Sequence, residues 1–450
     1  MMNELKGSIP VKSHDVFVVG GGLAGSEAAW QLAEAGVTVR LVEMRPSRPT
    51  PVHTTDRLAE LVCSNSLRGD APSNAVGLLK REMAVLDSLI IRAARNAAVP
   101  AGGALAVDRD LFAGAVTDAI EAHPGITIER REVTELPPGP AILATGPLTS
   151  RALHQELEDL LGEGSLAFFD AVAPIVARDS INRERVFRAS RYDKGGDDYL
   201  NIPLDRENYE LFVAGLLAAE RVAFKDFETD ELRYFEGCLP IEVMAERGLD
   251  TLRHGPMKPV GLVDPSTGRQ PWAVVQLRQD DLAAEHWNMV GFQTKLNHAE
   301  QKRLFRTLPG LAEARFVRLG MIHRNTFVNA PAHLDGLLRL RVRPQLRLAG
   351  QMTGVEGYVE SAATGLMAAR TLAAELRGSD VRPPPPDTAF GGLVRHLSAR
   401  SSAGFQPANI TWGLIACPPD LRVLRNKRQR REAQTERAQE AIAAWGASLV

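Results

Sequence analysis

The sequence predicts an α/β fold in which a Rossmann-like domain is interrupted by a smaller α+β domain. Two observations carry this prediction. A strand, a glycine-rich turn, a helix and a second strand follow one another between about 14 and 44, and the composition from about 180 to 330 shifts towards charged and aromatic residues. The length of 450 residues favours two or three domains, and a content of 44% hydrophobic and 24% charged residues is ordinary for a globular protein.

The glycine-rich turn has the pattern of a dinucleotide-binding site. Gly20, Gly22 and Gly25 form G-x-G-x-x-G between an apolar strand and an alanine-rich helix. Glycine there allows a tight turn and lets backbone N–H groups and the positive helix N-terminus approach a pyrophosphate. Glu43 ends the second strand, where a carboxylate can accept hydrogen bonds from a ribose. An ordinary tight turn is the alternative, and it leaves the flanking elements unexplained. The residues predicted to bind the nucleotide here are Gly20, Gly21, Gly22, Leu23, Ala24, Gly25 and Glu43.

The elements that follow this unit alternate between helix and strand, as expected for an α/β domain. They are a polar loop over 45–74, a helical stretch from 78 to 95, a glycine-rich loop into a short strand over 100–108, a helix over 113–122 and a strand over 126–133.

Two later segments indicate that the nucleotide is FAD. An apolar strand over 140–146 ends in Ala-Thr-Gly, which is typical of two-dinucleotide-binding-type, glutathione-reductase-type flavoproteins. A second apolar strand at 346–350 leads into a glycine-rich turn and a helix to about 376. The dipole of that helix would favour an anionic reduced flavin, whereas the alternative is a closely packed helix–sheet contact. The predicted cofactor-binding residues in these segments are Thr145, Gly146, Gly350, Gln351, Gly357 and Ser361.

The predicted domain organisation follows from these segments. The FAD-binding domain comprises 1–178 and 331–380, the inserted substrate domain comprises 179–330, and a proline-rich spacer with a helical tail comprises 381–450. A basic run at 425–431 is more typical of a solvated helix face than of an RNA contact.

Charge and hydropathy limit the partners. The net charge is −2, so an RNA partner would need local basic patches. No apolar run reaches the roughly 18 residues of a membrane span. The N-terminal residues lack the apolar core of a signal peptide, so we expect a cytoplasmic protein without a membrane partner.

The cysteines are the candidate reactive groups. Cys63, Cys238 and Cys417 show no metal-ligand spacing and cannot all pair, so we expect free thiols and no metal. A free thiol is most often a small buried apolar group, and a reactive one needs a nearby cation to lower its pKa from about 8.5. Arg233, Arg253 and Lys258 are candidate cations, and Cys417 is expected to be structural.

The surroundings of Cys63 and Cys238 carry a resemblance to a known family. With the seven segments 61–66, 99–109, 235–242, 255–261, 290–294, 323–327 and 354–361, the chain resembles the bacterial folate- and FAD-dependent tRNA uracil-5-methyltransferases, short relatives of the glucose-inhibited-division flavoproteins. Two departures are isoleucine at 202, where some relatives have cysteine, and an altered segment at 411–419.

The resemblance implies a reaction. A thiolate adds to C6 of the T-loop uridine of tRNA, C5 attacks the one-carbon unit of 5,10-methylenetetrahydrofolate, reduced FAD gives a hydride, and NAD(P)H restores the flavin. It implies Cys238 as nucleophile and Cys63 as the base at C5, although the chemistry alone allows either order. It further implies that Tyr358 stacks on the isoalloxazine. Candidate folate or RNA contacts are Asn65, Lys295 and Arg324.

Three other functions compete with this one. The larger paralogous flavoprotein, which modifies wobble uridines with a partner GTPase, has a long C-terminal extension, whereas this sequence ends about 70 residues after the last FAD helix. No protein partner is evident. An FAD oxidoreductase acting on a small metabolite would give no role to Cys238. A tRNA-binding or folding factor with structural FAD would tolerate the loss of both cysteines.

Overall fold

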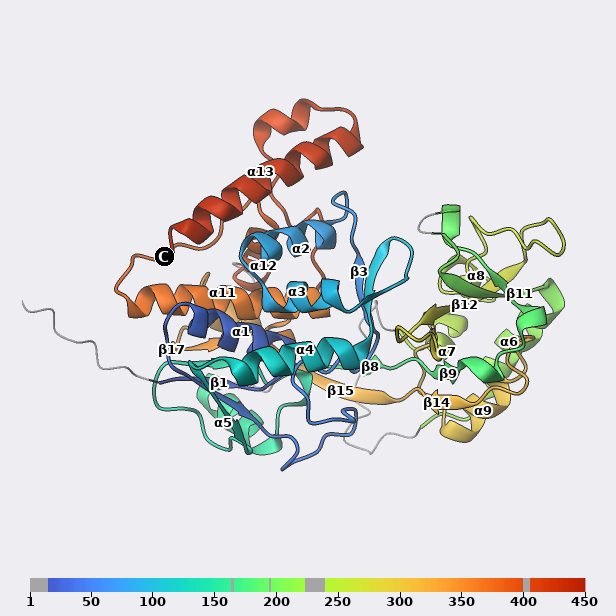
Figure 1. The fold of residues 1–450 in the computed structure, drawn as a ribbon, viewed down its shortest axis with the longest axis horizontal. Coiled ribbons are helices and arrows are strands. Elements are labelled where there is room, and N and C mark those ends of the chain that lie inside the picture. Colours follow the sequence, from blue (N-terminus) through green and yellow to red (C-terminus); the bar gives the residue numbers. More distant parts are fainter. Residues whose placement is uncertain (1–14, 163–165, 194–195, 223–238, 400–404, 450) are drawn as a thin grey trace, which may run out of the picture.

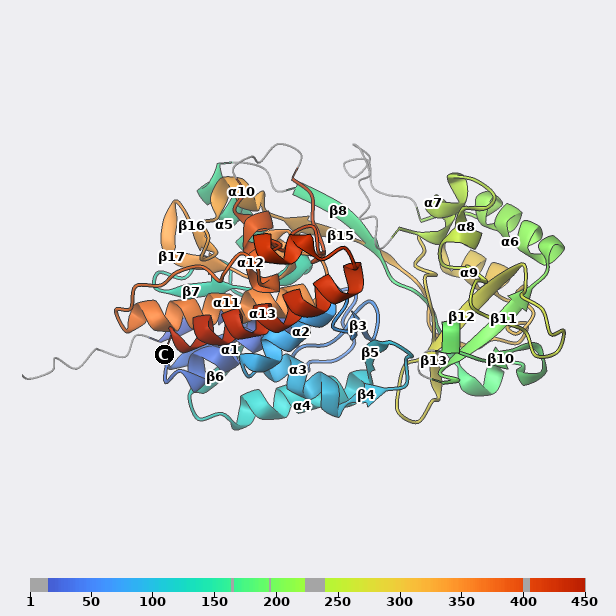
Figure 2. The ribbon, with the colours of Figure 1, turned by 90° about the horizontal axis from the view of Figure 1, so that it is seen from above.

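The computed structural model describes residues 15–162, 166–193, 196–222, 239–399 and 405–449, with 166–171 and 322–326 as backbone alone (Figure 1). They form two bodies, which lie side by side in both views (Figures 1 and 2). The larger contains both predicted cofactor segments, and the smaller is built on strands between 175 and 318. An antiparallel pair of strands, β8 (Leu166–Ala171) and β15 (Ile322–Phe327), runs between them.

A parallel sheet is the centre of the larger body. Within the described residues it has six strands in the order β16-β17-β7-β1-β2-β6, and only β16 runs antiparallel to its neighbour. Its central strands are apolar and buried, as expected where helices cover both faces. The strands are β1 (Val16–Val19), β2 (Val39–Glu43), β6 (Ile126–Arg130), β7 (Ala141–Leu143), β16 (Arg339–Leu340) and β17 (Arg343–Leu348).

Two helices bring the cofactor segments together. Helix α1 (Leu23–Glu34) follows β1, and α11 (Tyr358–Leu376) follows β17. A Cβ at Gly365 would lie 2.1 Å from the carbonyl oxygen of Ala24, so the two backbones touch at that point. The sheet order then places β1, β7 and β17 side by side. The three glycine-containing turns therefore meet at one edge of the sheet.

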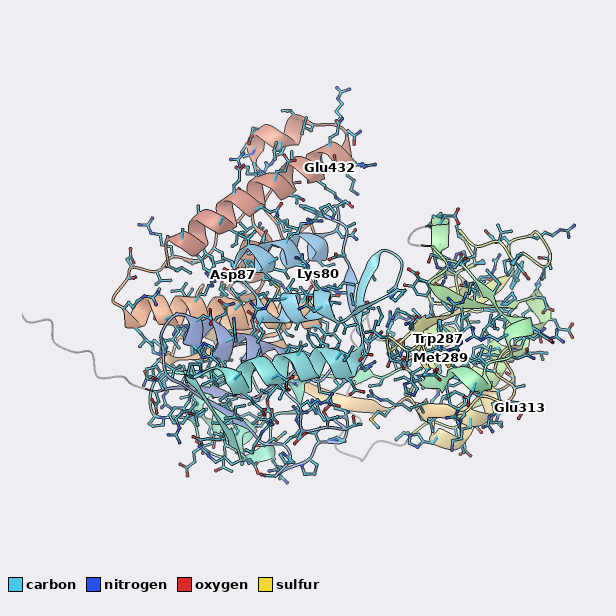
Figure 3. All side chains as sticks on the ribbon, in the orientation of Figure 1. Lys80, Asp87, Trp287, Met289, Glu313 and Glu432 are labelled. Carbon is cyan, nitrogen blue, oxygen red and sulfur yellow. The ribbon has the colours of Figure 1, made fainter. Side chains whose placement is uncertain are left out.

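The helical stretch expected over 78–95 is two helices, α2 (Ala75–Val85) and α3 (Leu89–Asn96). Asp87 has φ +55° and breaks the helix, and the Ser88 side chain accepts from the Ile91 N–H to begin the next one. The stretch is helical as expected, and the break within it was not predicted because the apolar spacing continues through the capped turn. Figure 3 labels Lys80 within α2 and Asp87 in the turn that follows it.

The smaller body is an antiparallel sheet covered by helices. Its described strands have the order β10-β11-β12-β13-β9-β14. Trp287 and Met289 of β13 are fully buried in its core (Figure 3). The strands are β9 (Ile175–Ala177), β10 (Phe187–Arg188), β11 (Tyr199–Leu204), β12 (Ala273–Gln279), β13 (His286–Met289) and β14 (Phe316–Arg318). The helices are α6 (Arg206–Ala218), α7 (Ile241–Glu246), α8 (Thr251–His254) and α9 (His298–Phe305).

The remaining elements complete the larger body. A small sheet has the order β3-β5-β4, and α13 crosses above α2, with Asn426 as its N-cap (Figure 1). In the part of the chain that is described, no helix is long and apolar enough to cross a membrane. These elements are β3 (Ser66–Gly69), β4 (Ala98–Val99), β5 (Ala104–Val107), α4 (Arg109–Ala122), α5 (Arg151–Leu161), α10 (Ala330–His333), α12 (Ala389–Leu397) and α13 (Lys427–Ala447). Short 3-10 turns are η1 (Gly146–Leu148), η2 (Arg178–Ser180), η3 (Arg183–Arg185), η4 (Arg191–Asp193), η7 (Gln351–Thr353) and η8 (Pro419–Val423).

Candidate active site

The glycine-rich turn leaves no room for side chains at two of its three motif glycines. Gly20 has φ +103°, and a Cβ there would lie 2.5 Å from the Ala144 carbonyl oxygen. A Cβ at Gly25 would lie 1.8 Å from the Gly20 carbonyl oxygen, whereas one at Gly22 would meet no atom within 4 Å. The turn is therefore closed by β7 on one side and open on the other, which is the shape a pyrophosphate cradle needs.

A cavity of about 820 Å³, including its open mouth, starts at this turn. Its walls come from the three predicted segments together with the loop after β2. A cavity that runs from the glycine cradle past these segments fits FAD. Of the predicted residues, Gly20, Gly22, Leu23, Ala24, Glu43, Thr145, Gly146, Gly350, Gln351, Tyr358 and Ser361 line it. Gly21, Gly25 and Gly357 adjoin it in the same turns.

Glu43 fixes the turn. Its Oε2 accepts from the Gly21 N–H at 2.7 Å, and its Oε1 accepts from the N–H and Nε of Arg45, both at 3.0 Å. Burial alone would raise the pKa of Glu43, but Arg45 and these hydrogen bonds lower it overall, so the carboxylate is charged. One lone pair of Oε2 stays available, and this is the atom that could accept from a ribose hydroxyl.

The loop after β2 supplies cavity residues that the sequence analysis missed. Met44, Arg45, Thr50, His53, Glu60 and Val62 all line the cavity. Arg45 bridges the carboxylates of Glu43 and Glu60, at 3.0 and 3.1 Å. Burial, helped by Arg45, lowers the pKa of His53 to about 4, so its imidazole is neutral. The arginine two residues after Glu43 was the available signal, because a buried acid at a strand end needs a partner.

Tyr358 connects the cavity to the Cys63 loop. Its ring lines the cavity, and its hydroxyl oxygen accepts from the backbone N–H groups of Cys63 at 2.7 Å and Ser64 at 3.2 Å. Burial, followed by the charge of Cys63, raises the pKa of Tyr358, so the phenol stays protonated. Cys63, half-buried, is thereby held at the edge of the cofactor cavity.

Three arginines donate hydrogen bonds to the loop that contains Cys63. We name Arg109, Arg278 and Arg318 the arginine collar. Arg109 donates to the carbonyl oxygens of Leu61 and, at 3.3 Å, Cys63. Arg278 donates to Ser64 Oγ at 2.7 Å, and Arg318 donates to the Val62 carbonyl oxygen. Arg109 also pairs with Asp280, 2.9 Å from Nε to Oδ2. None of these cations was predicted, because they are far apart in the sequence.

Asn65 is a structural link in this conformation. It is fully buried, and its Nδ2 donates to the carbonyl oxygens of Val107 at 2.9 Å and Gln279 at 3.0 Å. Its Oδ1 accepts from Arg278 Nε at 2.9 Å. The side chain is closed to folate or RNA, so the geometry favours a role in joining the two bodies.

The remaining predicted residues lie in or near the inserted domain. Lys295 is 8% exposed, and its N–H donates to Glu242 Oε1 at 2.7 Å. Arg324 pairs with Phe169 in the β15–β8 register, and its side chain is outside the described residues. Cys238 and Arg233 also lie outside them. Arg253 is engaged elsewhere, with its guanidinium carbon 3.7 Å from the Trp272 ring centroid. Cys417 is half-buried in the C-terminal segment. Among the residues with described positions, no three His, Cys, Asp or Glu side chains gather as a metal site would require.

Known proteins resemble this chain over nearly its whole length. The family model "Glucose inhibited division protein A" matches residues 15–380. Relatives named methylenetetrahydrofolate–tRNA-(uracil-5-)-methyltransferase TrmFO are 57% identical in Sphingopyxis alaskensis, over 96% of this chain and 97% of the relative. In Anaeromyxobacter dehalogenans strain 2CP-1 the identity is 58%, over 96% and 95%. The chain belongs to the TrmFO family. The predicted resemblance is therefore confirmed.

A solved structure agrees on the fold. GidA from Aquifex aeolicus superposes with a TM-score of 0.70 at 16% identity, over 98% of this chain and 74% of that one. The predicted FAD-type α/β fold with an insertion is confirmed at this level. The larger paralogue is disfavoured, because this chain is 57% identical to the TrmFO relative of Sphingopyxis alaskensis over 96% of its length.

Proposed function

We propose that this chain methylates C5 of the T-loop uridine of tRNA, taking the one-carbon unit from 5,10-methylenetetrahydrofolate. The observation that carries the proposal is the place of Cys63: its backbone N–H is bound by Tyr358, a wall residue of the cofactor cavity. A thiol beside a flavin site is what the chemistry named for the TrmFO relatives requires. FAD, when bound, supplies the hydride that brings the transferred carbon to the methyl level, and NAD(P)H is the reductant that restores it.

Two cysteines of this chain carry out different steps of the proposed reaction. The thiolate of Cys238 forms a bond to C6, and the C5–C6 π electrons move to the O4 oxygen as an enolate. C5 then attacks the methylene carbon of the folate, and one carbon–nitrogen bond of the donor breaks with its electron pair on nitrogen. The thiolate of Cys63 takes the C5 proton: an S–H bond forms, and the electrons of the C5–H bond form a double bond to the methylene carbon while its second bond to folate nitrogen breaks with the pair on nitrogen. Once a hydride reaches this carbon, the C5–C6 double bond is restored and the sulfur of Cys238 leaves C6 with its bonding electrons.

The glycine cradle, Glu43 and Tyr358 would hold the cofactor. The N-terminus of α1 and the backbone around Gly22 would bind the pyrophosphate, and the free lone pair of Glu43 Oε2 could accept from a ribose hydroxyl. Tyr358 lies at the cavity end nearest Cys63, where the isoalloxazine would stack. The uridine must be turned out of the folded T loop to reach this place. The tRNA substrate is in the cytoplasm, so the reaction would take place there.

Covalent trapping tests the proposal. A T-loop RNA hairpin carrying 5-fluorouridine is incubated with flavin-loaded protein and the folate donor, since fluorine cannot leave C5 as a proton would. We expect a denaturation-resistant adduct with wild type, Cys63→Ala and the control Cys417→Ala, and none with Cys238→Ala. Loss only in Cys63→Ala would exchange the two roles. No adduct with any variant would contradict the proposal and favour a flavin oxidoreductase acting on a small molecule.

A further inference from the structure

The arginine collar is built from both bodies of the molecule. Arg109 is the first residue of α4 in the larger body, whereas Arg278 in β12 and Arg318 in β14 come from the inserted domain. Together they contact four consecutive residues, 61–64. Arg278 is 7% exposed, and the Arg109 side chain is 16% exposed. Guanidinium groups this far from water act strongly on a neighbouring charge.

The charge around Cys63 is positive on balance. The titratable groups around the loop 61–64 are Arg109 on α4, Arg278 and Asp280 at the end of β12, Arg318 on β14, Tyr358 on α11, and His53 and Glu60 of the loop after β2. Tyr358 and His53 are neutral, and Glu60 is paired with Arg45. Three guanidinium groups therefore face one carboxylate, Asp280.

The arginines and Cys63 are electrostatically coupled. Burial would lower the pKa of Arg109, but Asp280, Tyr358 and Cys63 raise it overall. Burial and the neighbouring Arg109 lower the pKa of Arg318, and Cys63 opposes this. Both cations would therefore be stabilised by a negative sulfur at Cys63.

We propose that the arginine collar holds Cys63 as a thiolate, and that the inserted domain, by supplying Arg278 and Arg318, activates the thiol when it is seated against the FAD domain. This rests on the proposed function, in which Cys63 accepts the C5 proton. An ordinary cysteine, with a pKa of about 8.5, is mostly protonated at pH 7 and could not accept it. The three arginines are positioning residues that act through Cys63.

Hydrogen bonds between the bodies hold this arrangement. Asn65 Nδ2 donates to the Gln279 carbonyl oxygen at 3.0 Å, and the Leu282 N–H donates to Asp108 Oδ2 at 2.9 Å. Tyr199 Oη donates to the Ala101 carbonyl oxygen at 3.0 Å. These bonds flank the collar, so a movement of the inserted domain would withdraw two of its three cations. Whatever seats that domain, including RNA bound on it, would set the reactivity of Cys63.

The test measures the protonation of Cys63 directly. In the flavin-loaded Cys238→Ala, Cys417→Ala protein, Cys63 is the remaining cysteine. The rate of its alkylation by iodoacetamide, followed against pH, gives the midpoint of thiol ionisation. We expect a midpoint below about 7.5. Arg318→Met should raise it by at least one pH unit, a tenfold loss of thiolate at neutral pH, and Arg318→Lys should restore most of the shift.

Two further variants separate charge from folding. Arg315→Met makes the same change three residues away, at an exposed arginine paired with Asp179, and should leave the midpoint unchanged. Asp280→Asn removes the carboxylate of the collar and should lower the midpoint, a direction that loss of structure would not produce. Equal midpoints in Arg318→Met, Asp280→Asn and the parent would overturn the proposal. If the midpoints are equal but the 5-fluorouridine adduct forms normally, the proposed function stands. Only the proposal that the collar ionises Cys63 is then contradicted.

Discussion

The glycine cradle and the arginine collar are two solutions to binding negative charge in one molecule. The cradle uses backbone N–H groups within a few residues of sequence, from Gly20 to Gly25. The collar uses three side chains from positions 109, 278 and 318, in both bodies. The comparison teaches that the cofactor site is a property of one local segment, whereas the reactive thiol depends on how two bodies meet.

A single methyl group added at Gly25 should abolish flavin binding by the cradle. In Gly25→Ala the new Cβ would be 1.8 Å from the Gly20 carbonyl oxygen, which only a shift of the turn can relieve. Overpacking of this kind costs about 1–3 kcal/mol or more, and the shift would move the pyrophosphate N–H groups. We expect purified protein without flavin absorbance. Gly103→Ala is the matched control, because its Cβ also meets nothing within 4 Å and it does not line the cavity, so this variant should keep flavin. Equal flavin loading of both variants would contradict the cradle.

The collar's thiol should matter for turnover and not for the cofactor. We expect Cys63→Ala to lower methyl transfer to T-loop RNA by about 10²–10⁴-fold, the usual contribution of a positioned base. Flavin absorbance should be retained, because the Cys63 contact to Tyr358 uses the backbone N–H, which alanine keeps. Cys417→Ala should behave as wild type. Loss of flavin from Cys63→Ala would mean that this side chain shapes the cofactor cavity. The cradle and the collar would then not be independent of each other.

These two regions also differ in what the sequence could predict. The glycine spacing, Glu43 and the Ala-Thr-Gly strand are local patterns, so the fold class and most cavity residues were predicted. The collar has no local pattern: Arg109 and Arg318 meet at one loop only because β14 and α4 are brought together by the domain arrangement. Asn65 was assigned to folate or RNA from its motif, whereas its burial at 0% exposure favours a structural link. Helix α3 is the opposite case, because its start had a local signal in the sequence. Ser88 is a typical N-cap residue, and it lies inside the helical stretch that was expected.

Asn65 gives a way to weaken the junction without touching a charge. Asn65→Ala would leave the Val107 and Gln279 carbonyl oxygens and Arg278 Nε without their buried partner. Unsatisfied buried groups cost about 1–3 kcal/mol each, less any that water can reach, so we expect a loss of about 2–3 kcal/mol in the free energy of unfolding. Urea unfolding measures it. Asn208→Ala, at an exposed helix start, should cost no more than about 1 kcal/mol. An Asn65→Ala variant as stable as wild type would show that the bodies are held by other contacts.

The last effect concerns a buried acid within the larger body alone, and it does not reach the cradle or the collar. Glu82 of α2 is fully buried and accepts from the N–H groups of Ala389 at 2.7 Å and Phe390 at 3.0 Å, at the start of α12. Burial raises the pKa of Glu82 to about 8, more than these hydrogen bonds lower it. Because the folded-state pKa is above the unfolded value of about 4.3, its stabilising contribution is complete below pH 4.3 and is lost as the pH rises through 8.

We therefore expect the free energy of unfolding to fall by up to about 1.4 kcal/mol per pH unit between pH 5 and 8 from this group. Glu82→Gln should remove that slope while keeping an acceptor for one of the two N–H groups, since these bind different oxygens of Glu82. Urea midpoints measured from pH 5 to 9 give the comparison, with the exposed Glu432→Gln on α13 as the matched control (Figure 3). A slope unchanged by Glu82→Gln would mean that the α2–α12 junction opens to water. The pH response of Cys63 alkylation should be the same in Glu82→Gln and its parent, because this carboxyl is no part of the collar.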